Sequence, residues 1–176
     1  MKRARKIRKT KFIAYVAASI DGRISLGRKE IPNWTSAEDK KFFQSELRRF
    51  DAVVVGRNTY EAAKKPLEKR NTYVLSSRVR NIVQKGSVMF LNPSRTNIVK
   101  VFAKYNRVAV LGGGKVYQTM LDKKLLNEIY LTLEPLVFGR GVEMFVGGRK
   151  IYKLNLLTIK KLNKIGTLLL RYKIVY

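Results

Sequence analysis

The sequence predicts an α/β domain with a mixed, mostly parallel sheet. Short apolar runs, typical of strands buried on both faces, alternate with segments whose apolar residues recur at helical spacing. A short polar turn at 163–166 joins the last two runs, which predicts an antiparallel hairpin at one edge of the sheet. We therefore expect a three-layer fold with helices flanking the sheet and the hairpin closing it.

The elements of the first half follow from composition and turn signals. Nearly continuous runs of Val, Ala, Ile, Leu and aromatic residues predict buried strands, and polar stretches with Gly or Pro predict loops. Helices are expected where apolar residues return every three or four positions. In chain order we expect a strand at 12–18, a long loop at 26–34, a helix beginning near 35, a strand at 51–56, a helix from 57 and a strand at 72–75.

The second half repeats the alternation and then changes to antiparallel strands. Pro135 sets the end of an alternating segment, and two glycines in 138–142 predict a flexible loop. In chain order we expect a strand at 88–91, a helix at 94–105, a strand at 108–111, a helix from 113, a strand at 128–133, and hairpin strands at 154–162 and 167–175.

Length and composition limit the possible functions. With 176 residues and 45% hydrophobic content, the chain is expected to form one domain over 12–176, preceded by a basic flexible tail over 1–11. The absence of cysteine and histidine excludes disulfides, thiolate metal sites and a histidine base. Acid–base chemistry must fall on one of twelve carboxylates, or on Tyr or Lys. No apolar run is long enough to span a membrane, so a cytoplasmic location is expected.

The formal charge of +26 raises the alternative of a nucleic-acid-binding module. The basic residues are spread along the whole chain, and the RNA-recognition and zinc-finger signatures are missing. Specific nucleic-acid binding is therefore not expected. Attraction of an anionic cofactor or substrate is the more modest consequence of the same field.

A strand–glycine–helix junction at 107–121 predicts a phosphate-binding site. Gly112, Gly113 and Gly114 allow a ligand to approach the backbone, and the first turn of the following helix offers unpaired N–H groups. The alternative is a plain strand-to-helix turn, which needs only one glycine. Gly56 with Arg57 and Thr59, and Ser76 with Ser77 and Arg78, end two further strands. Three such strand ends indicate a long, multiply phosphorylated ligand.

Asp39 is the candidate acid. It shares a helical face with Phe43, Leu47 and Phe50, and burial on an apolar face raises the pKa of a carboxyl group. We expect Thr35 and Glu38 to form a capping box at the start of this helix. In the alternative, Ser36 is the cap and Asp39 is only its partner at the third helical position.

Taken together, the segments 56–60, 66–70, 75–77 and 112–117 resemble the dihydrofolate reductase superfamily, with order and spacing agreeing from Phe12 onward. The resemblance implies NADPH as cofactor, a cis bond between Gly112 and Gly113, and binding of the 2′-phosphate by Arg57, Ser77 and Arg78. The implied cofactor-binding residues are Ala18, Ile24, Gly56, Arg57, Asn58, Thr59, Leu75, Ser76, Ser77, Arg78, Leu111, Gly112, Gly113, Gly114, Lys115, Val116 and Tyr117.

The resemblance also implies the substrate side of the site. Asp39 would promote protonation of a dihydropterin, and Thr132 would bond to that acid. Arg70 would bind the carboxylate of the substrate's glutamate. Ala17, Ile31, Phe43 and Leu47 would line the pocket, and Trp34 would join Ile31 in a loop over the nicotinamide.

Two other segments are more similar to the pyrimidine reductases of riboflavin synthesis. These are 19–24 and 135–145. The expected activity is NADPH-dependent reduction of dihydrofolate. The alternative is reduction of a ribosylamino-pyrimidinone phosphate with the same cofactor. The folate type implies a monomer and the riboflavin type a homodimer, and the sequence leaves both open.

Overall fold

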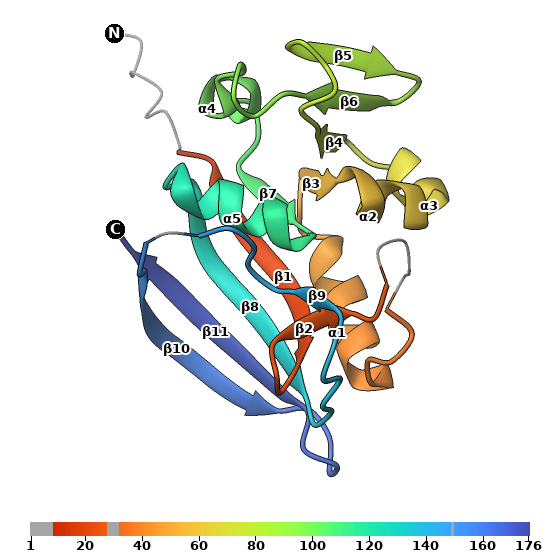
Figure 1. The fold of residues 1–176 in the computed structure, drawn as a ribbon, viewed down its shortest axis with the longest axis vertical. Coiled ribbons are helices and arrows are strands. Elements are labelled where there is room, and N and C mark those ends of the chain that lie inside the picture. Colours follow the sequence, from red (N-terminus) through yellow and green to blue (C-terminus); the bar gives the residue numbers. More distant parts are fainter. Residues whose placement is uncertain (1–8, 28–31, 149) are drawn as a thin grey trace, which may run out of the picture.

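A nine-stranded sheet runs through the molecule in the order β10-β11-β8-β1-β7-β3-β4-β6-β5 (Figure 1). The computed structural model describes residues 9–27, 32–148 and 150–176. Within them the sheet strands are β1 (Lys11–Ser19), β3 (Ala52–Gly56), β4 (Thr72–Leu75), β5 (Ile82–Lys85), β6 (Val88–Leu91), β7 (Arg107–Val110), β8 (Leu126–Glu134), β10 (Lys153–Lys161) and β11 (Leu168–Val175). A separate ribbon pairs β2 (Arg23–Ser25) with β9 (Val142–Glu143).

The sheet is mixed and mostly parallel, as predicted. Strands β8, β1, β7, β3, β4 and β6 run parallel to their neighbours, while β5 and the β10–β11 hairpin pair antiparallel at the two edges. The carboxyl ends of six strands therefore meet at one edge, where open α/β sheets bind their ligands.

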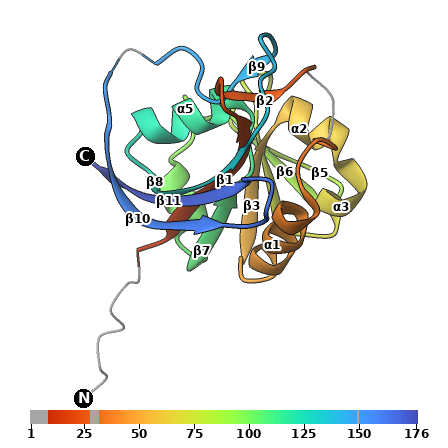
Figure 2. The same cartoon turned by 90° about the horizontal axis from the view of Figure 1, so that it is seen from below.

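Helices cover both faces of the sheet, which confirms the three-layer arrangement. On β1, Phe12 and Ala14 pack in one hydrophobic cluster with residues of α4 (Ile98–Phe102) and α5 (Gly114–Asp122). Ile13 and Tyr15 face the other cluster, beside α1 (Ala37–Leu47), α2 (Arg57–Ala62) and α3 (Lys64–Glu68). Figure 2 shows α5 and α1 on opposite sides of the sheet. Alternating side chains of a buried strand thus serve two separate cores.

Some elements differ from the sequence prediction. The helix expected at 94–105 is only Ile98–Phe102, because Asn97 caps it with its side chain and Asn92 folds the preceding residues into a turn. The short elements β5 and α3 were not predicted. Every residue of β5 is exposed, so its strand forms by pairing with β6 and leaves no apolar run in the sequence.

The first described residues already belong to the fold. The Thr10 hydroxyl donates to the carbonyls of Phe102 and Tyr105, both at 2.9 Å, and Lys11 begins β1. Residues 1–8 of the expected basic tail lie outside the described residues. In the described part of the chain, no helix has the length and apolarity needed to cross a membrane.

The loop at 138–142, expected to be flexible, is attached by hydrogen bonds at its start, and its last residue, Val142, belongs to β9. The Asp21 carboxylate accepts N–H groups of Phe138 (3.0 Å) and Gly139 (2.9 Å) and the hydroxyl of Ser19 (2.6 Å). The β2–β9 ribbon continues this attachment, with an ion pair between Arg23 and Glu143 at 3.1 Å. The sequence signal was missed because Asp21 and the loop are more than a hundred residues apart.

The Asp21→Ala variant is expected to release this loop. The Ser19 hydroxyl, and then the Phe138 N–H, lower the pKa of Asp21 from 3.8 to about 2. The contribution of the carboxylate is therefore complete above its ordinary pKa and is lost only as the pH falls through about 2. At pH 4 to 5, amide hydrogen exchange at Phe138 and Gly139 should be faster in Asp21→Ala than in the wild type. Equal protection in the two proteins would contradict the assigned contacts.

Candidate active site

A cleft of about 1800 Å³ lies along the carboxyl edge of the parallel strands. Its walls come from β1, β3 and β4, from Leu111 directly after β7, and from α1, α2, α3 and α5. One end is formed by the glycine-bearing turns, and the other by α1, α3 and the end of β8. The two groups of residues singled out from the sequence therefore face one continuous space.

The glycine end joins two strand ends directly. The Gly56 N–H donates to the carbonyl of Gly112 at 2.7 Å, so the starts of α2 and α5 lie side by side. The Thr59 hydroxyl lies 3.9 Å from the position that a Cβ on Gly113 would take. The Gly112–Gly113 peptide bond is cis, as the resemblance implied, and Gly112 has a φ of +111°, which glycine adopts readily.

Cationic and hydroxyl groups lie around this end. Arg57, Ser77, Arg78 and Lys115 all line the cleft. The Ser76 hydroxyl accepts the backbone N–H of Arg78 at 3.2 Å and so shapes the turn that carries Ser77. Backbone amides at the start of a helix and guanidinium groups are the usual partners of phosphate in proteins.

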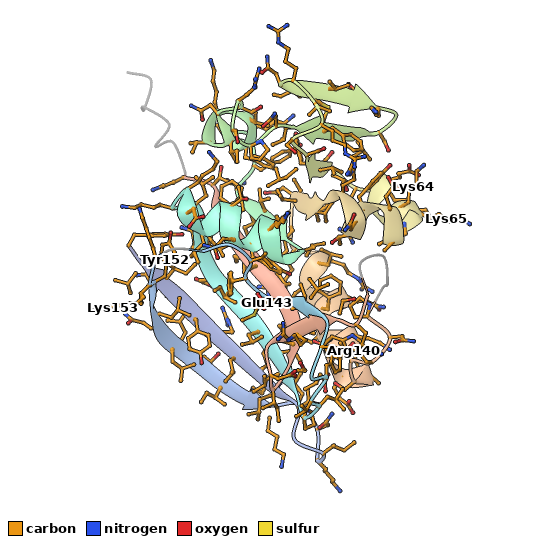
Figure 3. The ribbon with its side chains drawn as sticks, in the orientation of Figure 1. Lys64, Lys65, Arg140, Glu143, Tyr152 and Lys153 are labelled. Atoms are coloured by element: carbon orange, nitrogen blue, oxygen red, sulfur yellow. The ribbon has the colours of Figure 1, made fainter. Side chains whose placement is uncertain are left out.

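The third glycine of the turn has a packing role that the sequence did not show. A Cβ on Gly114 would lie 2.3 Å from the carbonyl oxygen of Glu143 and 2.8 Å from a methyl group of Val146. The chain at β9 therefore crosses directly over the first turn of α5. Figure 3 shows Glu143 on this crossing segment. The three glycines serve two purposes, an open turn and close contact with the β2–β9 ribbon.

Asp39 forms the acidic centre at the other end. It is 8% exposed and lines the cleft. Burial raises the pKa of its carboxyl group, while hydrogen bonding from Thr132 and Thr35 acts in the opposite direction. Thr132 pairs with Ala17 in the β1–β8 register, which sets both residues in the wall beside the acid. A carboxyl group in this setting can hold a proton closer to neutral pH than an exposed one.

The expected capping box was wrong. Ser36 is the N-cap, and its hydroxyl oxygen accepts the backbone N–H of Asp39 at 3.3 Å. Glu38 instead accepts a hydrogen bond from Asn163 at 3.3 Å. Because the cap uses only the backbone of Asp39, its side chain remains available to the cleft. The two alternatives for Asp39 are therefore compatible.

The remaining predicted substrate-side residues also line this end. They are Ala17, Phe43, Leu47 and Arg70, and one guanidinium nitrogen of Arg70 donates to the carbonyl of Leu47 at 3.1 Å. This contact attaches the residue after α3 to the end of α1. Arg70 thereby keeps a fixed position at the cleft while part of its guanidinium group can bind an anion.

Two predicted residues need separate comment. Ala18 is buried and does not line the cleft, whereas its neighbours Val16 and Ala17 do. Ile31 lies outside the described residues. Trp34, expected in the same loop, packs edge-on against Phe138 with ring centres 5.0 Å apart. All the other predicted site residues line the cleft.

Sequence reasoning missed a set of aromatic and acidic residues on β1, β8 and α1. Tyr15 and Tyr130 line the cleft with ring centres 4.8 Å apart, and the Tyr15 hydroxyl donates to Glu46 at 2.8 Å. Glu134, the last residue of β8, is buried two positions beyond Thr132. The alternation of β8 could have revealed this set, since Tyr130, Thr132 and Glu134 share one face.

An α/β cleft with glycine turns at one end and a buried acid at the other is typical of nucleotide-dependent reductases. The sequence model of dihydrofolate reductase matches residues 12–134. The chain belongs to the dihydrofolate reductase family. It is 24% identical to the uncharacterized protein YwjB of Bacillus subtilis, over 77% of this chain and 82% of that protein. It is 20% identical to dihydrofolate reductase of Candida albicans, over 68% and 67%.

Solved structures of two kinds share the fold. A putative riboflavin biosynthesis protein of Shewanella sp. PV-4 matches with a TM-score of 0.73 and 22% identity, over 95% of this chain and 100% of that one. RibD of Acinetobacter baumannii matches at 0.75 and 17%, over 96% and 59%. Dihydrofolate reductase of Enterococcus faecalis, complexed with NADP(H), matches at 0.66 and 21%, over 94% and 97%.

The Gly114→Ala variant tests the packing role of the third glycine. The added methyl group would overlap backbone of β9, and overpacking of this kind costs about 1–3 kcal/mol. Thermal unfolding should therefore show a clear loss of stability. Lys115→Ala, at the next position of the same turn, adds nothing against the ribbon and should unfold at the wild-type temperature. Equal unfolding temperatures for all three proteins would contradict the close approach.

Proposed function

We propose that the protein is an NADPH-dependent dihydrofolate reductase whose single reductase domain spans 12–176. The observation that carries this proposal is the buried carboxyl group of Asp39 beside Thr132 in the cleft wall, at the opposite end from the glycine turns. Reduction of a dihydropterin needs a hydride on carbon and a proton on the adjacent nitrogen. A carboxyl group whose pKa is raised by burial in the wall of the same cleft meets the second need.

The glycine end fits NADPH. Gly56, Gly112 and Gly113 leave backbone uncovered along the turn, where a side chain would otherwise occupy the space beside Thr59. Arg57 and Arg78 offer positive charge for a phosphate on the adenosine side. Membership of the family and the NADP(H) complex of the Enterococcus faecalis enzyme support the same cofactor. When bound, NADPH supplies the hydride.

The other residues orient the substrate. Asp39 would form hydrogen bonds with the amino group and a ring nitrogen of the pterin and promote protonation of N5 through a water molecule. Phe43 and Leu47 would cover the apolar faces of the substrate. Arg70, held to the carbonyl of Leu47, would bind the carboxylate of the glutamate. Fixed orientation of the two reacting rings is the main contribution of such a site to the rate.

A second candidate is the reduction of a ribosylamino-pyrimidinone phosphate. The observation that favours it is the β2–β9 ribbon, which joins 19–24 to 135–145, the two segments more similar to riboflavin-pathway reductases. The structural likeness to the Shewanella and Acinetobacter proteins supports the same alternative. In this reaction Arg70 and the neighbouring lysines Lys65 and Lys69 would bind the substrate phosphate. Figure 3 shows Lys65 at the outer end of α3.

The Asp39→Asn variant should lower turnover by about 10²-fold or more, because an amide cannot supply the proton. In the wild type, the raised pKa of Asp39 should keep the rate high toward neutral pH, and the rate should fall as the pH rises through that pKa. Asp39→Asn should lose this fall. NADPH oxidation followed at 340 nm across the pH range measures both effects, and wild-type turnover in Asp39→Asn would return Asp39 to a purely structural role.

The Arg70→Ala variant separates the two candidate substrates. If Arg70 binds a glutamate carboxylate, KM for dihydrofolate should rise at least tenfold, while KM for a dihydropterin without glutamate should stay near that of the wild type. Loss on both pterins alike would contradict the assignment. A parallel assay with the pyrimidinone phosphate completes the comparison, since activity on that substrate alone would favour the second candidate.

A further inference from the structure

Glu134 joins two parts of the molecule that are far apart in the sequence. It is 3% exposed and ends β8. One carboxylate oxygen accepts the backbone N–H of Ser36 at 2.8 Å, and the other accepts the hydroxyl of Thr167 at 2.6 Å. Ser36 is the N-cap of α1, and Thr167 precedes β11. Both oxygens of the buried group are therefore used.

Asn163 closes these contacts into a ring. Its side-chain NH₂ donates to the Thr167 hydroxyl at 2.9 Å and to the Glu38 carboxylate at 3.3 Å. The side-chain amide oxygen of Asn163 accepts the backbone N–H groups of Gly166 and Thr167 and so shapes the hairpin turn. The ring runs from the first turn of α1 through the β10–β11 turn to β8 and back to the cap of α1.

Two features link this ring of hydrogen bonds to Asp39. Ser36, whose N–H Glu134 accepts, uses its own side chain to accept the backbone N–H of Asp39. Glu134 also lies on the same face of β8 as Thr132, the hydrogen-bonding neighbour of Asp39. The charged groups that act on Asp39 are Glu134 from β8, which raises its pKa, and Lys40 from α1, which lowers it.

Holding the N-cap residue of α1 in place does not by itself require that Glu134 be a carboxyl group. Any oxygen acceptor could bind the Ser36 N–H, and a neutral acceptor would avoid the cost of burying a charge. A carboxylate close to a second acid differs from a neutral acceptor in one respect, since its charge disfavours ionisation of that acid.

We propose that Glu134 is a positioning residue for Asp39: its carboxylate holds the first turn of α1 against β8 and places a second negative charge on the face of β8 that carries Thr132. The proposal deepens the proposed function and rests on it for the role of that proton. It also connects the C-terminal hairpin, which lies beyond the residues matched by the family, to Asp39 through Glu134 and Ser36.

The first test measures the acid itself, without substrate or cofactor. The ¹³C resonance of the Asp39 carboxyl group, assigned with Asp39→Asn, is followed through a pH titration. In Glu134→Gln the midpoint should fall by about half a pH unit or more, the scale of one neighbouring like charge at a partly screened site. Glu38→Gln is the matched control, since it removes the same charge one residue from Asp39, and its midpoint should stay within about 0.2 units of the wild type.

An unmoved midpoint in Glu134→Gln, or equal shifts in Glu134→Gln and Glu38→Gln, would overturn the proposal. If Glu134→Gln fails to fold, Glu134→Asp takes its place. This variant keeps the charge but shortens the side chain, so it should lower turnover about fivefold or more and leave the basic limb of the pH profile unmoved. Wild-type turnover in folded Glu134→Asp would equally overturn the positioning role.

The same variants distinguish failure of this inference from failure of the proposed function. If no pterin or pyrimidine is reduced but the Asp39 midpoint shifts as expected, the proposed function fails and the link between the two carboxyl groups stands. If dihydrofolate is reduced and the pH profile of Glu134→Gln matches the wild type, the inference fails and the function stands.

Discussion

The hydrogen bond from Gly56 to Gly112 holds the site together, because it joins the ends of β3 and β7 at the place where α2 and α5 begin. A Cβ on Gly56 would lie 3.0 Å from a methyl group of Val116, so a side chain at this strand end would crowd the first turn of α5. The uncovered backbone of both turns then faces one cleft. The β2–β9 ribbon closes over the same place, where Gly114 allows its passage. Packing of the chain and space for a ligand thus depend on the same few glycines.

Buried carboxyl groups are unusual in a chain as basic as this one. Lys and Arg number 38 against 12 Asp and Glu, so an acid that the fold places away from solvent and without a strong ion pair stands out. Asp39 and Glu134 are both of this kind, and Ser36 connects them, because Glu134 accepts its backbone N–H and its hydroxyl accepts the N–H of Asp39. Burying them is costly. The fold offsets that cost with hydroxyl and backbone N–H donors, which keep the two groups in fixed positions while leaving one of them in the cleft wall.

The division between the two candidate activities follows the architecture. The central strands and glycine turns form the end of the cleft that both candidates assign to the cofactor. The choice between the candidates rests on the β2–β9 ribbon, the loop after Pro135 and the basic residues at the substrate end, all of which lie outside the parallel sheet. In such a protein the loops decide which substrate binds. The sheet and helices hold these loops in place but do not determine their sequence.

The sequence by itself determined the buried strands, the C-terminal hairpin, the glycine turns and the candidate acid, because periodicity and turn chemistry are local properties of the chain. It could not show β5, the attachment of 138–142 to Asp21, the Ser36 cap in place of Thr35 and Glu38, or the ring through Glu134. Each of these depends on contacts between residues far apart in the chain, such as Thr167 with Glu134 and Gly114 with Glu143. Only the tertiary structure decided them, since a local pattern specifies which face of an element is apolar but not which distant residue meets it.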